Sequence, residues 1–129
     1  MAQTADMILC DTNILIEFYK DNPRIIDALH LIGYSEIAIS VITQGELYFG
    51  ALNKKELAAI QRHLSLVHLV PISEAVSRRF ISLMERYSLS HKLSIPDALI
   101  AATAIEHELL LYTLNERDFH FIESLRLYE

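Results

Sequence analysis

The stretch from Met7 to Asn13 constrains this chain most, because four apolar residues lead directly into an aspartate and two small polar residues. The apolar run is too short for a buried helix and does not alternate with polar residues. Both properties are typical of a strand covered on both faces, as in a parallel sheet. Asp11 then stands where the strand ends, at the kind of place where ligands bind in open α/β sheets. A second interpretation stays open, in which Asp11 only caps the helix predicted over residues 14–20.

Short apolar segments alternate with amphipathic segments along the rest of the chain. Further strands are predicted at residues 37–41, 66–70 and 109–114, with a short final strand at 125–127. Helices are predicted at residues 14–20, 24–31, 43–52, 54–64, 73–87 and 97–107, with a polar loop at 88–94. This alternation predicts a three-layer α/β fold with a central, mostly parallel sheet of four to five strands flanked by helices.

Length and composition set the remaining bounds. A chain of 129 residues with 52% hydrophobic residues predicts a single domain over residues 1–129 with a real core. The one cysteine, Cys10, excludes a disulfide framework and a cysteine-rich zinc site. We expect no secretory signal and no membrane span, and therefore a cytoplasmic protein. A net charge of −6 counts against a protein that coats nucleic acid, but permits a carboxylate metal site and a basic partner.

Three further acids occupy positions similar to that of Asp11. Asp118 follows a predicted strand, and Glu46 and Asp97 are expected in the first turns of predicted helices. In a doubly wound sheet, such positions converge on one edge. Clustered carboxylates repel one another, and hard oxygen ligands without a cysteine pair favour Mg²⁺ or Mn²⁺. Such a site suits phosphoryl chemistry, because divalent metals activate water and neutralise developing phosphate charge.

Each of these acids also has a purely local explanation. Thr43 and Glu46 match a capping box, in which the threonine begins the helix and the glutamate bonds back to it. Asp97 complements the dipole of the apolar helix that follows it. Asp118 is explained as a turn residue, because Asn and Asp are common in turns. The residues taken one at a time leave these alternatives open.

Four segments together resemble the motifs of PIN domains, and within that family most resemble the VapC-type toxins of bacterial toxin–antitoxin pairs. They are residues 10–13 (CDTN), 41–47 (VITQGEL), 95–102 (IPDALIAA) and 113–119 (TLNERDF). The resemblance implies a parallel sheet of strand order 3-2-1-4-5 and a metal-dependent endoribonuclease that is usually dimeric and is inhibited by a cognate antitoxin. Some relatives carry Asp where this chain has Asn115, so the last metal contact is expected from Asp118.

On this interpretation, one or two Mg²⁺ ions bind Asp11, Asp97 and Asp118, with Glu46 as a further ligand or as the base that orients water. Four polar residues are expected to orient the acids or bound water, although turn and cap bonding would explain them too: Thr12, Asn13, Thr113 and Asn115. Three basic residues are candidate contacts for the RNA backbone, or simply solvated charges: Arg86, Lys92 and Arg117.

Three hypotheses of function follow. The first is an RNA hydrolase that forms a homodimer and binds an antitoxin helix beside Glu46, in a groove near Tyr48, Phe49 and Leu52. The second is a catalytically silent PIN-like module for dimerisation and antitoxin or operator binding, against which the four intact acids speak. The third is a receiver-like phosphoacceptor domain, which does not explain Glu46 and lacks the usual adjacent acidic pair.

Overall fold

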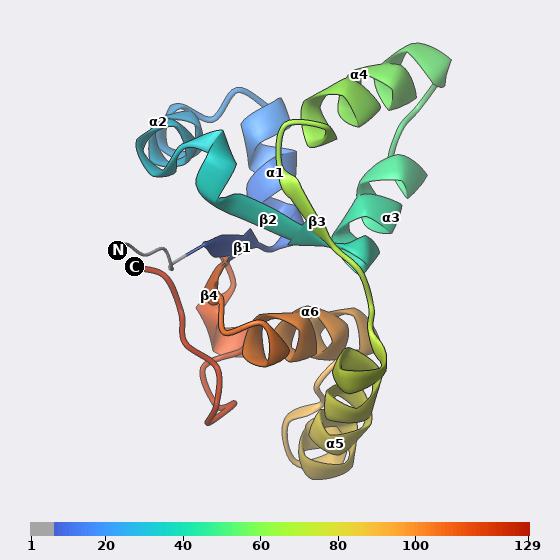
Figure 1. The fold of residues 1–129 in the computed structure, drawn as a ribbon, viewed down its shortest axis with the longest axis vertical. Coiled ribbons are helices and arrows are strands. Elements are labelled where there is room, and N and C mark those ends of the chain that lie inside the picture. Colours follow the sequence, from blue (N-terminus) through green and yellow to red (C-terminus); the bar gives the residue numbers. More distant parts are fainter. Residues whose placement is uncertain (1–6) are drawn as a thin grey trace.

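The computed structural model describes residues 7–129 and places a parallel four-stranded sheet between two layers of helices (Figure 1). The strands are β1 (Ile8–Cys10), β2 (Ile37–Ser40), β3 (His68–Val70) and β4 (Leu110–Tyr112). Their order is β3-β2-β1-β4, so the first strand is central and pairs with both β2 and β4. The predicted three-layer α/β fold is confirmed, and so is the predicted order of these four strands.

Helices cover both faces of this sheet. They are α1 (Thr12–Tyr19), α2 (Pro23–Ile32), α3 (Val41–Phe49), α4 (Lys54–Leu64), α5 (Glu74–His91) and α6 (Ile95–Glu106), with short 3₁₀ turns η1 (Tyr34–Glu36) and η2 (Glu116–Asp118). In Figure 1, α1 to α4 lie above the sheet and α5 and α6 lie below it. None of the helices within residues 7–129 is long and apolar enough to cross a membrane.

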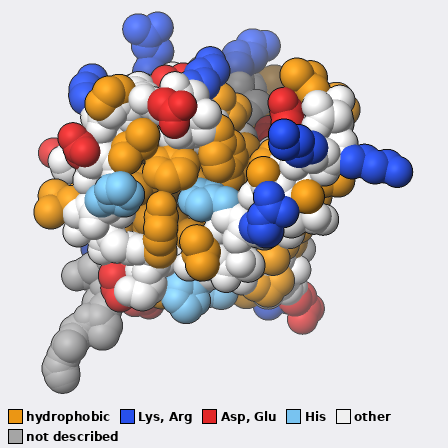
Figure 2. All heavy atoms as spheres, turned by 90° about the horizontal axis from the view of Figure 1, so that it is seen from above, with side chains coloured by type: hydrophobic (Ala, Val, Ile, Leu, Met, Phe, Trp, Pro, Cys, Tyr) orange, Lys and Arg blue, Asp and Glu red, His pale blue; other side chains and the backbone are white. Residues whose placement is uncertain are grey.

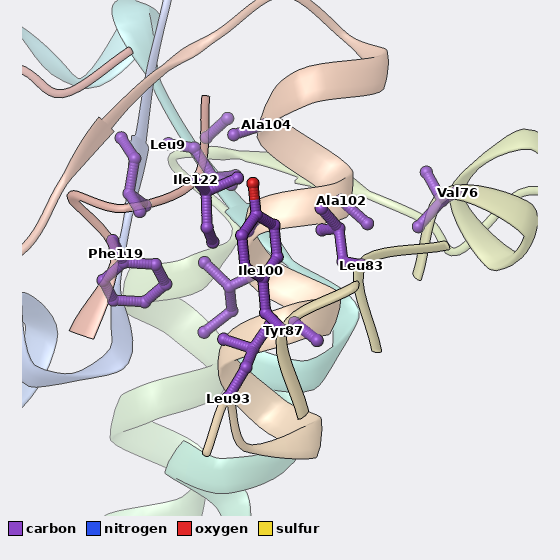
Figure 3. Close-up of a cluster of buried hydrophobic side chains, with 14 residues drawn as sticks. Leu9, Val76, Leu83, Tyr87, Leu93, Ile100, Ala102, Ala104, Phe119 and Ile122 are labelled. Carbon is purple, nitrogen blue, oxygen red and sulfur yellow. The ribbon is translucent and has the colours of Figure 1, made fainter. Parts of the chain in front are cut away.

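The central strand shows why an unbroken apolar run was needed. Ile8 and Cys10 pack into the core beneath α1 to α4, whereas Leu9 packs into the core on the α5 and α6 side. Figure 3 shows that second core, where Leu9 lies near Phe119 and Ile122 from the C-terminal part of the chain. Because successive side chains of a strand point to opposite faces, a strand covered on both sides has no position for a polar residue until it ends.

Several predicted boundaries were wrong, for local reasons. Residues 88–91 are the last turn of α5 and not a loop, and Lys92 ends that helix in a left-handed conformation with φ 56°. The segment 125–127 forms no strand, and only Leu127 makes an isolated parallel bridge, to Leu111 of β4.

Helix α3 also begins earlier than predicted. Its N-cap is Ser40, whose side chain accepts a hydrogen bond from the backbone N–H of Thr43. The capping box of Thr43 and Glu46 is therefore wrong, and Glu46 lies in the second turn of α3 and not in the first. A cap at Ser40 removes the local explanation for a glutamate at position 46.

Candidate active site

The four predicted carboxylates come together at the end of the sheet where the strands finish. Asp11 directly follows β1, and Asp118 lies in η2, shortly after β4. Glu46 comes from α3 and Asp97 from the first turn of α6, and these two helices contact each other. Burial is the largest cause that raises the pKa of Asp11 and of Asp97, and neighbouring acids add to it. The charges of Glu46 and Asp118 raise the pKa of Asp11, and the charges of these three acids raise the pKa of Asp97. The four acids thus lie near one another, at the end of the sheet where the sequence analysis expects them.

Asp11 is only 6% exposed, and both of its carboxylate oxygens accept hydrogen bonds. The backbone N–H of Thr12 donates to Oδ1 at 2.7 Å, and the Thr113 hydroxyl donates to Oδ2 at 2.7 Å. Burial raises the pKa of Asp11, these two hydrogen bonds lower it, and the neighbouring acids raise it again. Asp11 is also the N-cap of α1. Its capping role and its place in the cluster are therefore compatible, since each oxygen keeps a second lone pair.

Glu46 is half-buried, and Thr12, whose backbone N–H donates to Asp11, also holds Glu46. The hydroxyl of Thr12 donates to Oε1 of Glu46 at 2.5 Å, and the hydroxyl of Thr43 lies 3.0 Å from that of Thr12. Thr12 therefore joins two acids, through its backbone to Asp11 and through its side chain to Glu46. A charge-assisted bond of this length fixes the direction of the Glu46 carboxylate.

Asp97 and Asp118 are held less firmly. Asp97 is the third residue of α6, and its backbone N–H donates to the N-cap Ser94 at 3.2 Å. Burial and then the charge of Asp11 raise the pKa of Asp97 to about 6, although a hydrogen bond with the Ser94 side chain lowers it in part. Asp118 is exposed at the end of η2.

The donor chemistry of this cluster fits a hard divalent cation. All four side chains offer carboxylate oxygens, and none of the four takes part in an ion pair formed within residues 7–129. Clustered carboxylates repel one another, and a cation between them offsets that repulsion. The spacing is wider than ligation requires, because no three Asp, Glu, His or Cys side chains in residues 7–129 are placed to hold one metal ion.

The predicted supporting residues lie around these acids. Thr12 and Thr113 bond them directly, as described above. Asn13 accepts a hydrogen bond from the backbone of Leu114 at 3.3 Å, which links α1 to the loop after β4. Asn115 contributes its backbone N–H, which donates to the Thr113 hydroxyl at 3.0 Å.

Sequence reasoning missed the contribution of Ser40 and Thr43. Both are fully buried, their hydroxyls lie next to each other, and the Thr43 hydroxyl also lies next to that of Thr12. The available signal was the spacing of Ser40, Thr43 and Glu46 at intervals of three residues, which places them on neighbouring turns of one helix.

The predicted basic residues differ in availability. Arg86 forms an ion pair with Glu123 at 3.1 Å and lies over the ring of Tyr87. Lys92 and Arg117 are exposed, and neither forms an ion pair within the described part of the chain. Lys92 and Arg117 therefore have their charges less engaged within the described part of the chain than Arg86 does.

An apolar groove of about 850 Å³ opens beside Glu46, between α1, α3 and α4. Its walls include Ile16, Leu52 and Ile60, and Glu46 lies at its edge. Of the three residues predicted to form it, only Leu52 is part of the lining, and Phe49 is 93% exposed next to it. Figure 2, which looks onto the side of the sheet covered by α2 and α4, shows apolar and histidine side chains gathered in the middle of that face, with lysine and arginine toward its edges.

Fold and site together define an α/β domain with an acidic cluster at the carboxyl edge of its sheet, and comparison with known proteins specifies the family. The sequence profile of the PIN domain matches residues 8–123, so the chain belongs to the PIN domain family. It is homologous to VapC ribonucleases. Ribonuclease VapC10 of Mycobacterium tuberculosis is 34% identical over 122 residues, which cover 93% of this chain and 91% of that protein. Ribonuclease VapC19 of the same organism is 33% identical over 123 residues, covering 93% and 98%.

Solved structures agree with this assignment. A toxin–antitoxin complex from Klebsiella pneumoniae contains a chain with a TM-score of 0.79 and 35% identity, covering 95% of this chain and 98% of that chain. A DNA-bound VapBC from Salmonella typhimurium has a TM-score of 0.85 at 22% identity, covering 96% and 98%, which supports the fold alone.

Proposed function

We propose that this protein is a Mg²⁺-dependent endoribonuclease, the toxin of a type II toxin–antitoxin pair acting in the cytoplasm, and that Mn²⁺ can substitute for Mg²⁺. One observation carries the proposal: Asp11, Glu46, Asp97 and Asp118 lie at one edge of the sheet, and no basic side chain of residues 7–129 forms an ion pair with them. The homology to VapC ribonucleases gives the reaction class.

Asp11, Asp97 and Asp118 are the residues that would hold the cation. When bound, the cation supplies an activated water and neutralises the negative charge that develops on the phosphate. Glu46 has one oxygen fixed by Thr12, so its other oxygen is available to orient the attacking water and accept its proton. Lys92 and Arg117 position the RNA through its phosphates. Thr113 keeps the Asp11 carboxylate turned toward the cluster.

The test is RNA cleavage by the purified protein after exhaustive chelation with EDTA and after return of Mg²⁺ or Mn²⁺. Wild-type protein should be inactive without metal and active with it, and Asp97→Asn should be inactive in both conditions. Glu85→Gln, which neutralises an exposed acid on α5, is the matched control and should behave as wild type. Full activity after chelation would contradict the metal requirement.

We further propose that the protein forms a homodimer and that a cognate antitoxin inhibits it by occluding the site. The groove beside Glu46 suits an amphipathic helix, and an arginine or lysine at the end of that helix would reach the carboxylates. The similarity to a chain in a solved toxin–antitoxin complex supports this partner. Antitoxin should bind an Asp11→Ala, Asp97→Ala double variant more weakly than wild type. Equal affinity, in a complex that still admits RNA, would exclude occlusion.

The alternative is a catalytically silent module for dimerisation and for antitoxin or operator binding. The wide spacing of the acids is the observation that favours it. The same cleavage assay decides between the two, since a silent module cleaves no RNA at any metal concentration.

A further inference from the structure

Three hydroxyl groups form a continuous chain that ends at Glu46. The Oγ of Ser40 lies 3.4 Å from Oγ1 of Thr43, which lies 3.0 Å from Oγ1 of Thr12. Oγ1 of Thr12 in turn lies 2.5 Å from Oε1 of Glu46. Ser40 and Thr43 are fully buried and Thr12 is nearly so, and buried polar groups of this kind need partners within the protein.

The two ends of the chain fix the direction of its hydrogen bonds. At one end the backbone N–H of Thr43 donates to Ser40 Oγ at 3.2 Å, so the serine oxygen acts as an acceptor there and its own proton must go elsewhere. At the other end the ionised Glu46 carboxylate can only accept. Each hydroxyl has one proton. Ser40 therefore donates to Thr43, Thr43 donates to Thr12, and Thr12 donates to Glu46.

Capping of α3 does not require this chain. The cap needs only the Ser40 oxygen, and within the described structure the Thr43 hydroxyl bonds only to the hydroxyls of Ser40 and Thr12. A valine would fill the same volume at position 43 without the hydroxyl. What the Thr43 hydroxyl adds is a donor to Thr12, which leaves the proton of Thr12 committed to Glu46.

We propose that Thr43 is a positioning residue, which together with Ser40 directs the Thr12 hydroxyl onto one oxygen of Glu46, so that the other oxygen would be available to a bound cation or its water. The proposal rests on the metal-dependent cleavage proposed above and specifies how the protein prepares one of its acids. Because Thr12 also binds Asp11 through its backbone, the chain sets Glu46 relative to Asp11.

The experiment compares Thr43→Val, which removes the hydroxyl, with Thr43→Ser, which keeps it. Mg²⁺ affinity is read from the rise in melting temperature of metal-free protein on Mg²⁺ addition, and RNA cleavage is measured separately. Thr43→Val should bind Mg²⁺ about 10-fold more weakly and cleave RNA about 10–100-fold more slowly, the range for groups that orient metal ligands. Thr43→Ser should retain both. The matched control is Thr103→Val, which removes a fully buried hydroxyl that bonds only within α6.

A double variant shows whether Thr43 acts through Thr12. Thr12→Val should lose Mg²⁺ affinity by itself, and adding Thr43→Val should cause no further loss, because both belong to one chain. Independent, additive losses would overturn the proposal. If Thr43→Val fails to fold, as judged by circular dichroism, Thr43→Ala replaces it in the same comparison with Thr43→Ser.

The two proposals fail in different ways. A wild-type protein that neither binds Mg²⁺ nor cleaves RNA contradicts the proposed function. A wild type that does both, with Thr43→Val unchanged in both, contradicts only the positioning role of Thr43.

Discussion

Asp11 and Glu46 accept hydrogen bonds from neighbouring threonines, whereas Asp97 and Asp118 depend far less on side-chain partners. We refer to Asp11 and Glu46 as the held pair and to Asp97 and Asp118 as the open pair. The held pair follows β1 and β2 in the middle of the sheet, where packing is dense and each polar atom must be satisfied. The open pair lies on a helix start and an exposed turn at the other side of the cluster.

The comparison indicates that the protein orients the two pairs to different degrees. The protein fixes the directions of the held pair with its own hydrogen bonds, so those acids are oriented before any cation arrives. In the open pair, burial and then the charge of Asp11 raise the pKa of Asp97 to about 6. Binding of a cation would relieve that repulsion and draw the open pair toward the held pair. Sites of this kind trade stability for function.

The largest expected effect is on catalysis and is the same for both pairs. Asp11→Asn and Asp118→Asn should each reduce RNA cleavage by at least about 100-fold, because groups that merely orient a ligand already account for 10–100-fold. Initial rates at saturating Mg²⁺ measure this. Near-normal cleavage by Asp118→Asn would remove that residue from the site and leave the open pair with Asp97 alone.

A smaller effect, on Mg²⁺ affinity, should distinguish the held pair from the open pair. Thr113→Val deletes the hydroxyl that bonds Asp11, and we expect Mg²⁺ affinity to fall about 10-fold. Ser94→Ala, which alters the corresponding partner of Asp97, should change Mg²⁺ affinity less, because that acid is oriented less by the protein. Calorimetric titration of both variants tests this. Equal losses would mean that the two pairs are held alike.

Without metal, neutralising the open pair should stabilise the fold. Asp97→Asn should raise the melting temperature of metal-free protein by about 4 °C, the shift that ~1 kcal/mol produces in a domain of this size. Asp11→Asn should gain less, because it also loses a charge-assisted bond from Thr113 and alters the cap of α1. Thermal melts in EDTA give both values. A melting temperature lower than that of wild type for Asp97→Asn would show that the Asp97 carboxylate mainly stabilises α6 through the helix dipole.

The smallest expected effect is a pH dependence of the difference in melting temperature between Asp97→Asn and wild type. The pKa of Asp97 is about 6 in the folded protein against an ordinary value of 3.8, so the folded state binds this proton more tightly. Stability from this group is complete below pH 3.8 and is lost as pH rises through about 6. The gap in melting temperature between Asp97→Asn and wild type should therefore be small near pH 4 and reach a plateau above pH 6. A gap independent of pH would contradict this origin.

The sequence was sufficient to predict that Asp11 and Asp118 follow strands and that Asp97 lies in a first helical turn, but not that Glu46 lies in a second one. The apolar run ending at Asp11 predicted a strand covered on both faces, and the resemblance to PIN domains implied that this strand is central. The positions of the four acids at strand ends and helix starts predicted one shared edge. Strand ends and helix starts are signalled locally, by apolar runs and by residues such as Pro96 at the start of α6.

What the sequence did not predict depends on competition between neighbouring residues. Ser40 and Thr43 are both good caps, and the structure uses Ser40, the last residue of β2, as the N-cap of α3. That choice moves Glu46 to the second turn and frees Thr43 for the hydroxyl chain. Likewise, the polar residues Ser90 and His91 are exposed in the last turn of α5, and the helix continues through them until Lys92 adopts the left-handed conformation.

The central claim is that the held pair and the open pair form one cation site. Titration of metal-free protein with Mn²⁺, followed by the electron paramagnetic resonance signal of free Mn²⁺, tests it directly in wild type, Asp11→Asn and Asp97→Asn. We predict saturable binding by wild type and a loss of affinity of at least about 10-fold in each variant, one from each pair. Wild-type affinity in the Asp97→Asn variant would show that the two pairs do not share a cation.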